Sequence, residues 1–214
     1  MFIFKISTLT NLIAFIIGCI YFKYFSKEIK IVFYFVTFGA ATEIFTLFYK
    51  HFWMQNTGPI GHFYFPVSFF IMGMFFLMTL KDFIKPVYIL SLIISFEVLS
   101  LINVLFIQDL YEFPSLTGSL GAMILFLFSV AFFTKVMTEA KILKLSEEPL
   151  IWINSAALIY YTGNFIFYAL LNYANTYSRE FAVLTVKFFS YVNLLFYLLI
   201  AIGFWKVKKV KQYK

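Results

Sequence analysis

The sequence predicts an all-α membrane protein, a seven-transmembrane-helix bundle with the N-terminus outside and the C-terminus cytoplasmic. Composition is the first reason, because 63% of the 214 residues are hydrophobic and only 13% are charged, whereas about a quarter of the residues in a soluble domain are charged. The second is that apolar stretches close to the ~20 residues that a membrane-crossing helix needs recur along the chain. The third is that Lys and Arg are concentrated in alternate connections, as in multi-pass proteins.

Seven apolar stretches are the predicted helices, and together they form one transmembrane domain over residues 1–214. The runs do not alternate apolar with polar residues, as the strands of a membrane barrel do. A helix also satisfies every backbone hydrogen-bonding group within its own segment. In chain order, the predicted spans are residues 6–22, 31–49, 62–80, 86–107, 116–137, 150–171 and 181–205.

Turn and cap residues mark several of the boundaries between these spans. Residues 56–61 (Asn-Thr-Gly-Pro-Ile-Gly) have the composition of a turn and separate the second span from the third. Pro86 opens the fourth span and Pro149 the sixth, since proline is tolerated in the first turn of a helix. Because the connections are short, any activity must lie within the membrane or at its two surfaces.

The basic residues assign a direction to the bundle. Thirteen of the seventeen Lys and Arg residues fall on one side of the predicted membrane, three fall on the other, and Lys187 lies inside a span. The positive-inside rule places the thirteen in the cytoplasm. Basic residues at the ends of apolar stretches act as topology anchors, so the formal charge of +7 does not indicate a nucleic-acid partner.

The first nineteen residues admit a second interpretation, because they resemble a lipoprotein signal. A lysine near the start is followed by an apolar run that ends in Gly18-Cys19. Cleavage before Cys19 would leave six spans and place the lysine-rich connections outside, against the charge rule. Cys19 is the single cysteine, which excludes an intrachain disulfide and a metal cluster built on cysteines.

Polar residues inside the predicted membrane are the candidate site, because an ionisable group at the bilayer centre costs roughly 2.5–3.5 kcal/mol on insertion scales. The predicted ligand-binding residues are Glu43, His62, Glu97, Asn164 and Lys187. At a rise of about 1.5 Å per residue, Glu43 and Lys187 lie about 9 Å below the outer ends of their helices, and Glu97 lies near mid-membrane. We therefore predict a polar cavity that opens outward. The alternative is a polar network that only fixes helix packing.

Polar and small residues also fall on stripes that are predicted to point into the bundle. On the second span these are Gly39, Glu43 and Thr46, and on the seventh they are Lys187, Ser190, Tyr191 and Tyr197. A third stripe on the sixth helix consists of Asn154, Tyr161, Asn164, Tyr168 and Asn172.

No catalytic residue, metal ligand or cofactor is predicted. A retinal site needs a deep lysine with carboxylates nearby, whereas Lys187 is shallow and the third span has no acidic residue. The motif H-E-x-x-H of intramembrane metalloproteases is absent. Both histidines, His51 and His62, lie near the outer face, so a haem held by mid-membrane histidines is excluded.

Several short segments resemble a largely uncharacterised family of small seven-helix inner-membrane proteins of Bacteroidota. The similar segments are residues 62–66 (His-Phe-Tyr-Phe-Pro), 152–155 (Trp-Ile-Asn-Ser), 158–165 (Leu-Ile-Tyr-Tyr-Thr-Gly-Asn-Phe) and 202–206 (Ile-Gly-Phe-Trp-Lys), with Asn193 and Tyr197. The resemblance covers essentially the whole chain. It implies a multi-pass protein of the bacterial inner (cytoplasmic) membrane that works with a signalling partner such as a sensor kinase.

These observations favour a non-enzymatic sensory or accessory module that binds a small ligand, lipid or proton in the outward-facing cavity. Its partners would be the lipid bilayer and a cytoplasmic or membrane signalling protein, with no nucleic acid. Three alternatives stay open: a small transporter or channel subunit, a membrane-embedded lipid-modifying enzyme, and a purely structural subunit. The sequence leaves the ligand, the signalling partner and the oligomeric state undetermined.

Overall fold

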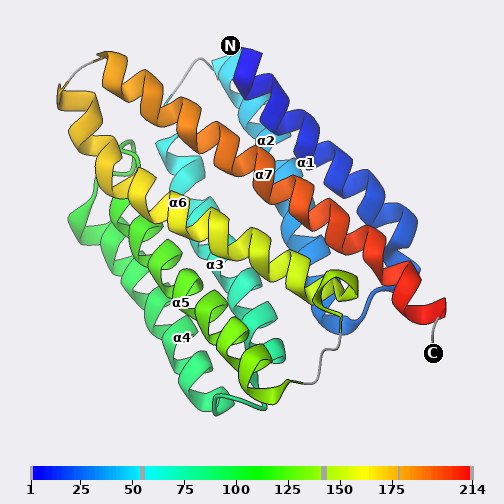
Figure 1. The fold of residues 1–214 in the computed structure, drawn as a ribbon. Coiled ribbons are helices and arrows are strands. Elements are labelled where there is room, and N and C mark those ends of the chain that lie inside the picture. The colour runs from blue at the N-terminus through cyan, green and yellow to red at the C-terminus, as the bar shows by residue number, and fades with distance from the viewer. Residues whose placement is uncertain (1, 54–55, 141–143, 178, 213–214) are drawn as a thin grey trace.

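The computed structural model describes residues 2–53, 56–140, 144–177 and 179–212, and within them every regular element is a helix (Figure 1). The all-α prediction is therefore confirmed. The long helices are α1 (Phe2–Tyr21), α2 (Lys27–Trp53), α3 (Gly58–Leu80), α4 (Pro86–Ile102), α5 (Ser115–Glu139), α6 (Pro149–Tyr177) and α7 (Arg179–Gln212). Short 3₁₀ turns cover Phe22–Tyr24 and Leu145–Glu147, and a π-helical turn over Asn103–Ile107 extends α4.

The helices have the length and composition of membrane-crossing segments. Over the described residues, six of them, α2 to α7, are long enough and apolar enough to span a membrane. The first helix and the 3₁₀ turn after it contribute a shorter apolar helix, Thr10–Tyr24. Backbone groups that are bonded within each helix leave no unsatisfied polar backbone to face lipid. The chain is therefore built as a multi-pass membrane protein.

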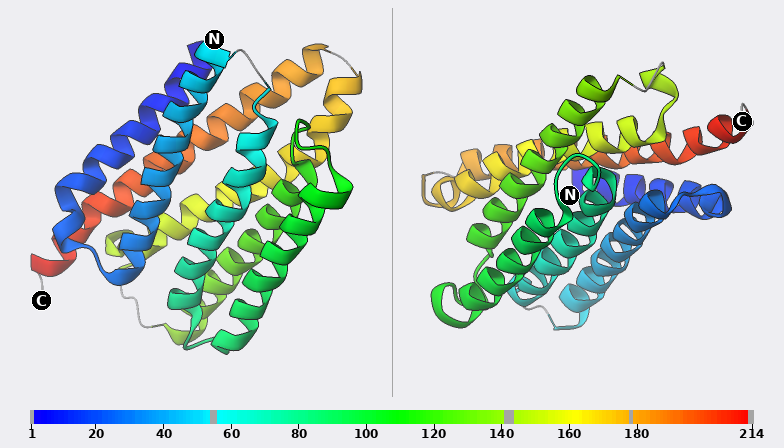
Figure 2. Two further views of the ribbon diagram at one scale, coloured as in Figure 1. Left: turned by 180° about the vertical axis from the view of Figure 1, so that it is seen from behind. Right: turned by 90° about the horizontal axis from the view of Figure 1, so that it is seen from below.

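Six helices form a closed ring and α4 packs outside it. Going around the ring, α1 contacts α2, which contacts α3, followed by α5, α6 and α7, and α7 returns to α1. The helix α4 packs mainly on α3 and has few contacts with α5, and Figure 2 shows it on the periphery. Phe96 and Ile93 contribute to this contact: Phe96 stacks on Phe69 of α3 with ring centroids 3.7 Å apart, and Ile93 packs against Gly73.

Successive helices run in opposite directions, so the bundle has two ends. The end that holds the N-terminus and the α2–α3, α4–α5 and α6–α7 connections is called the N end (Figure 1). The opposite end is called the C end. The α1–α2, α3–α4 and α5–α6 connections lie at the C end. Lysines that the sequence assigns to the cytoplasm lie in or beside these connections, among them Lys23, Lys30, Lys81, Lys85 and Lys144.

The half of the ring toward the C end is filled by large apolar side chains. Phe35, Phe75, Phe76, Phe196 and Phe204 are fully buried there. Such dense packing, rather than the hydrophobic effect, holds helices together in lipid. Within the described residues, buried polar side chains are few there, Thr79 and Asn154 among them, whereas the polar residues that line the cavity lie toward the N end.

Candidate functional site

A cavity of about 640 Å³ lies inside the ring at the N end. Side chains of α1, α2, α3, α6 and α7 line it, together with residues of the α2–α3 and α4–α5 connections. Pockets for small molecules have volumes of about 300–1,000 Å³. The cavity is therefore large enough for a small organic ligand.

The floor of the cavity gathers the polar groups. Asn11 of α1 is buried, and its Nδ2 donates a hydrogen bond to Oε2 of Glu43 on α2 at 3.4 Å. The side chains of Tyr64, Tyr197 and Asn193 also line the cavity. A carboxylate, two amides and tyrosine hydroxyls thus face one space deep in the bundle.

Gly39 is the point on α2 where these groups converge. A Cβ atom at this position would lie 3.0 Å from the hydroxyl of Tyr197, 3.7 Å from Nδ2 of Asn11 and 3.9 Å from the hydroxyl of Tyr64. Glu43 follows one turn later on the same face of α2. The absence of a side chain at Gly39 therefore keeps three polar groups from separate helices within reach of one ligand atom.

The walls of the cavity are aromatic and hold one another in place. Phe65 meets Tyr168 edge to face at a centroid distance of 5.1 Å, and Phe113 packs on the same tyrosine at 5.6 Å. Beside them, Phe167 of α6 stacks on Phe189 of α7 at 4.4 Å. Aromatic rings attract both apolar groups and cations.

The α2–α3 and α4–α5 connections pack together at the mouth of the cavity. Asn56 donates a hydrogen bond from Nδ2 to the carbonyl of Tyr111, and its Oδ1 accepts one from the backbone N–H of Gly58 at 2.9 Å. A Cβ on Gly58 would come within 2.7 Å of the carbonyl oxygen of Leu110, so only glycine fits there. Lys50, near the end of α2, is the one basic residue among those that line the cavity.

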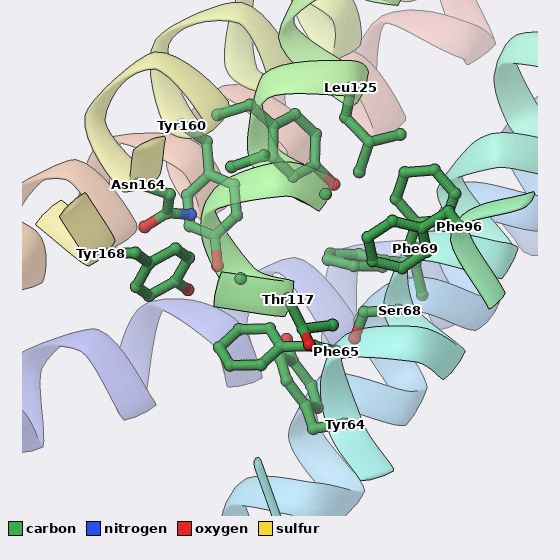
Figure 3. Close-up of a pocket in the computed structure, with 15 residues that line it drawn as sticks. Tyr64, Phe65, Ser68, Phe69, Phe96, Thr117, Leu125, Tyr160, Asn164 and Tyr168 are labelled. Carbon is green, nitrogen blue, oxygen red and sulfur yellow. The ribbon is translucent and has the colours of Figure 1, made fainter. Parts of the chain in front are cut away.

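A smaller chamber of about 40 Å³ lies behind the cavity, between α3, α5 and α6 (Figure 3). Tyr64, Phe65, Tyr160 and Tyr168 line both spaces and so form the partition between them. Asn164 of α6 lies in the chamber, 1% exposed.

The five residues predicted from the sequence as a ligand site occupy five different surroundings. Glu43 lines the cavity and Asn164 lines the inner chamber. His62 lies near the mouth, where Nε2 is 3.2 Å from the carbonyl oxygen of Asp109. Glu97 is half-buried on the peripheral helix α4, and Lys187 is exposed on α7. The structure therefore does not bring Glu43, Glu97 and Lys187 into one pocket.

Several cavity residues were not selected from the sequence. Asn11 is the single asparagine of the first span, and a polar residue at such a position is itself a signal. No feature of the sequence distinguishes Tyr64 and Tyr160, as cavity residues, from tyrosines that lie at a membrane interface.

Neither protein-family models, nor curated proteins, nor solved structures gave a match to this chain. Within the described residues, no group of three or more His, Cys, Asp or Glu side chains is placed to hold a metal ion. The site is thus defined by its geometry: one carboxylate, amides and hydroxyls at the floor, and aromatic walls above them.

Proposed function

We propose that this chain is a seven-span protein of the bacterial inner membrane whose N end faces outward. The positive-inside rule supports this direction, because the lysine-rich connections all lie at the C end. In this orientation the cavity opens to the outside of the cytoplasmic membrane. The resemblance to inner-membrane proteins of Bacteroidota agrees with this placement.

We further propose that the protein is a non-enzymatic sensory or accessory module that binds a small amphipathic amine in the cavity. The observation that carries this proposal is the convergence of Glu43, Asn11 and the tyrosine hydroxyls on the floor of a 640 Å³ cavity with aromatic walls. A protonated amine would pair with the carboxylate of Glu43, and the aromatic rings would cover the apolar part of the ligand. Glu43 is the one acidic residue among the cavity-lining residues, so it sets where the amine lies.

The helix α7 provides a route by which ligand binding would reach a signalling partner. Its residues Val186, Phe189, Asn193 and Tyr197 line the cavity, and the same helix continues to Gln212 at the C end. A shift of α7 on ligand binding would therefore displace the part of this helix that lies at the cytoplasmic surface. A partner such as a sensor kinase, in contact with this part of α7, would respond to the displacement.

Two of the three alternatives have less support in the structure. A transporter needs a continuous polar path to the C end, whereas the described part of that half is packed mainly with buried phenylalanines and has few buried polar side chains, such as Thr79 and Asn154. A lipid-modifying enzyme needs a second carboxylate or a histidine beside Glu43, and neither Glu97 nor His62 lines the cavity.

The proposal is tested by thermal unfolding of the purified protein in detergent, with primary arylalkylamines such as 2-phenylethylamine as probes and the matching alcohols as controls. We expect the amines, and not the alcohols, to raise the unfolding midpoint, because only a cation pairs with Glu43. Glu43→Gln should abolish the shift.

Tryptophan substitutions on α7 separate binding in the cavity from binding elsewhere. Val186→Trp fills the cavity and should abolish the shift caused by amines. Val183→Trp is the matched control, because Val183 is similarly exposed, 46% against 41%, but does not line the cavity. Equal shifts with amines and alcohols, or an amine shift that survives Val186→Trp, would overturn the proposal.

A further inference from the structure

The inner chamber behind the cavity has room for more than one small group. Its volume of about 40 Å³ exceeds the ~10–15 Å³ that one water molecule needs in a polar cavity. Its lining includes side chains of α3, α4, α5 and α6, and none of its lining residues carries a charge. Any occupant must therefore be small and neutral.

Three buried polar atoms of the lining residues have no hydrogen-bond partner within the described structure: Oγ of Ser68, the hydroxyl oxygen of Tyr161 and Oδ1 of Asn164. Their residues are 8%, 5% and 1% exposed, respectively. The hydroxyls of Tyr64 and Tyr160 interact with the side chains of Ser68 and Asn164, but Oγ of Ser68 and Oδ1 of Asn164 have no hydrogen bond of good geometry. Buried polar atoms in folded proteins are nearly always bonded to protein or to ordered water.

The chemistry of the three atoms defines the occupant. The amide oxygen of Asn164 only accepts hydrogen bonds, whereas the hydroxyls of Ser68 and Tyr161 both donate and accept. The amide oxygen requires a donor, and a neutral group that both donates and accepts, such as water or an alcohol hydroxyl, can also pair with either hydroxyl in any orientation. In Figure 3, Tyr160, Asn164 and Tyr168 of α6 face Ser68 and Phe69 of α3 across this space.

We propose that the inner chamber is a second binding site, for neutral hydroxyl groups. Water fills it in the resting protein, and a hydroxyl group of the cavity ligand enters it on binding. The second half of this proposal rests on the proposed function, and it narrows the ligand to an amphipathic amine that also carries a hydroxyl group. The first half stands independently of any ligand.

The position of the chamber allows one ligand to reach both sites. Tyr64 approaches Gly39 at the floor of the cavity and also lines the chamber, so the two spaces are one side chain apart. The rings of the partition are held by stacking, Tyr64 on Phe38 at 5.6 Å and Tyr160 on Phe196 at 4.1 Å. The residues of the partition therefore border the amine site on one side and the hydroxyl site on the other.

The water-filled state is tested by the sign of a stability change in the ligand-free protein. In a hydrated chamber, Tyr161→Phe and Ser68→Ala each remove hydrogen bonds to water, so the unfolding midpoint should fall by about 2–4 °C. In a dry chamber the same changes delete an unpartnered polar atom, so the midpoint should stay or rise. Tyr191→Phe is the control, because Tyr191 is 57% exposed and should change nothing. An unchanged or higher midpoint for both chamber variants would overturn the proposal.

The ligand-bound state is tested by comparing 2-phenylethylamine with 4-(2-aminoethyl)phenol, which adds one hydroxyl at the far end of the ring. We expect the phenol to bind about tenfold more tightly to the wild-type protein, and Tyr161→Phe to remove this advantage while leaving the affinity for 2-phenylethylamine unchanged. Equal binding of the two amines would overturn the hydroxyl site in the ligand complex and leave the proposed function standing. If neither amine binds, the proposed function fails together with this half of the inference, and the stability measurement alone decides the hydration of the chamber.

Discussion

The amide of Asn11 and the carboxylate of Glu43 connect α1 to α2 at the floor of the cavity. A hydrogen bond to a charged group stabilises a folded protein by roughly 1.5–3 kcal/mol. The pair therefore helps to fix both the position of the carboxylate and the approach of the two helices. The ligand site and the packing of α1 therefore depend on the same contact.

This contact is checked by changing its charge. Asn11→Asp places two carboxylates beside each other and should lower the free energy of unfolding by roughly 1.5–3 kcal/mol. Adding Glu43→Gln restores one amide and one carboxylate in the reverse order, so the double variant should recover most of the loss. Unfolding in detergent measures both. A double variant that is no more stable than Asn11→Asp would show that the two side chains do not interact.

The sequence identified which polar residues lie in the membrane but not which of them share a cavity. Glu43 was predicted as a ligand-binding residue of the second span, and it lines the cavity. On α7, Lys187, Ser190, Tyr191 and Tyr197 were treated as one inward stripe, yet Ser190 and Tyr197 are buried whereas Lys187 and Tyr191 are exposed. A stripe spans more than 100° of a helix, and only tertiary packing decides which edge of it faces inward.

At the scale of the helices, small residues set the distances of the ring. Gly163 on α6 packs against Val192 on α7, and a Cβ at Gly163 would lie 2.9 Å from Cγ1 of the valine. Valine has few allowed rotamers and cannot move aside easily. Close approach at such small residues is the usual basis of helix association in membranes.

Gly163→Ala should therefore separate α6 from α7 and lower the free energy of unfolding by about 1–3 kcal/mol, the usual cost of overpacking. Val192→Ala in the same protein removes the clashing methyl groups and should restore part of the loss. Unfolding of the two variants in detergent gives the comparison. If Gly163→Ala were as stable as the wild type, the close packing of α6 on α7 described above would be contradicted.

The peripheral position of α4 predicts a different outcome for Glu97. Neither Glu97 nor Lys187 lines the cavity or the chamber, so Glu97→Leu and Lys187→Leu should leave the amine-induced shift unchanged. Both variants should insert more efficiently, because a charged residue within a membrane helix costs roughly 2.5–3.5 kcal/mol on insertion scales. The yield of membrane-inserted protein and the amine shift are the measurements. Loss of the shift in either variant would assign that residue to the ligand site.

The number, order and type of the helices could be predicted from the sequence, because long apolar runs are a strong local signal. Each predicted span falls on one helix. The helices extend beyond several predicted ends, as α2 does by four residues at each end, over Lys27–Trp53 instead of residues 31–49. Charged and aromatic residues at these ends form further helical turns at the membrane interface, and hydropathy does not register them. The ring order and the position of α4 outside the ring depend on contacts between distant segments, so local patterns in the sequence could not predict them.

As a whole, the molecule is a ring whose two halves differ. Phenylalanines close the half toward the C end, and the half toward the N end encloses the cavity and its polar floor. A closed inner half favours binding and signalling over transport. This interpretation requires that the cavity be open to water on the outer side of the membrane.

Cysteine accessibility tests this requirement most directly. In a Cys19→Ser background, Thr46→Cys places a thiol in the cavity, and Ile44→Cys places one on the exposed face of the same helix, where Ile44 is 46% exposed. Spheroplasts are treated from outside with a membrane-impermeant maleimide. We predict that Thr46→Cys is labelled and Ile44→Cys is not, because only the cavity holds water. Labelling of Thr46→Cys only in inside-out vesicles, or in neither preparation, would contradict an outward-facing cavity.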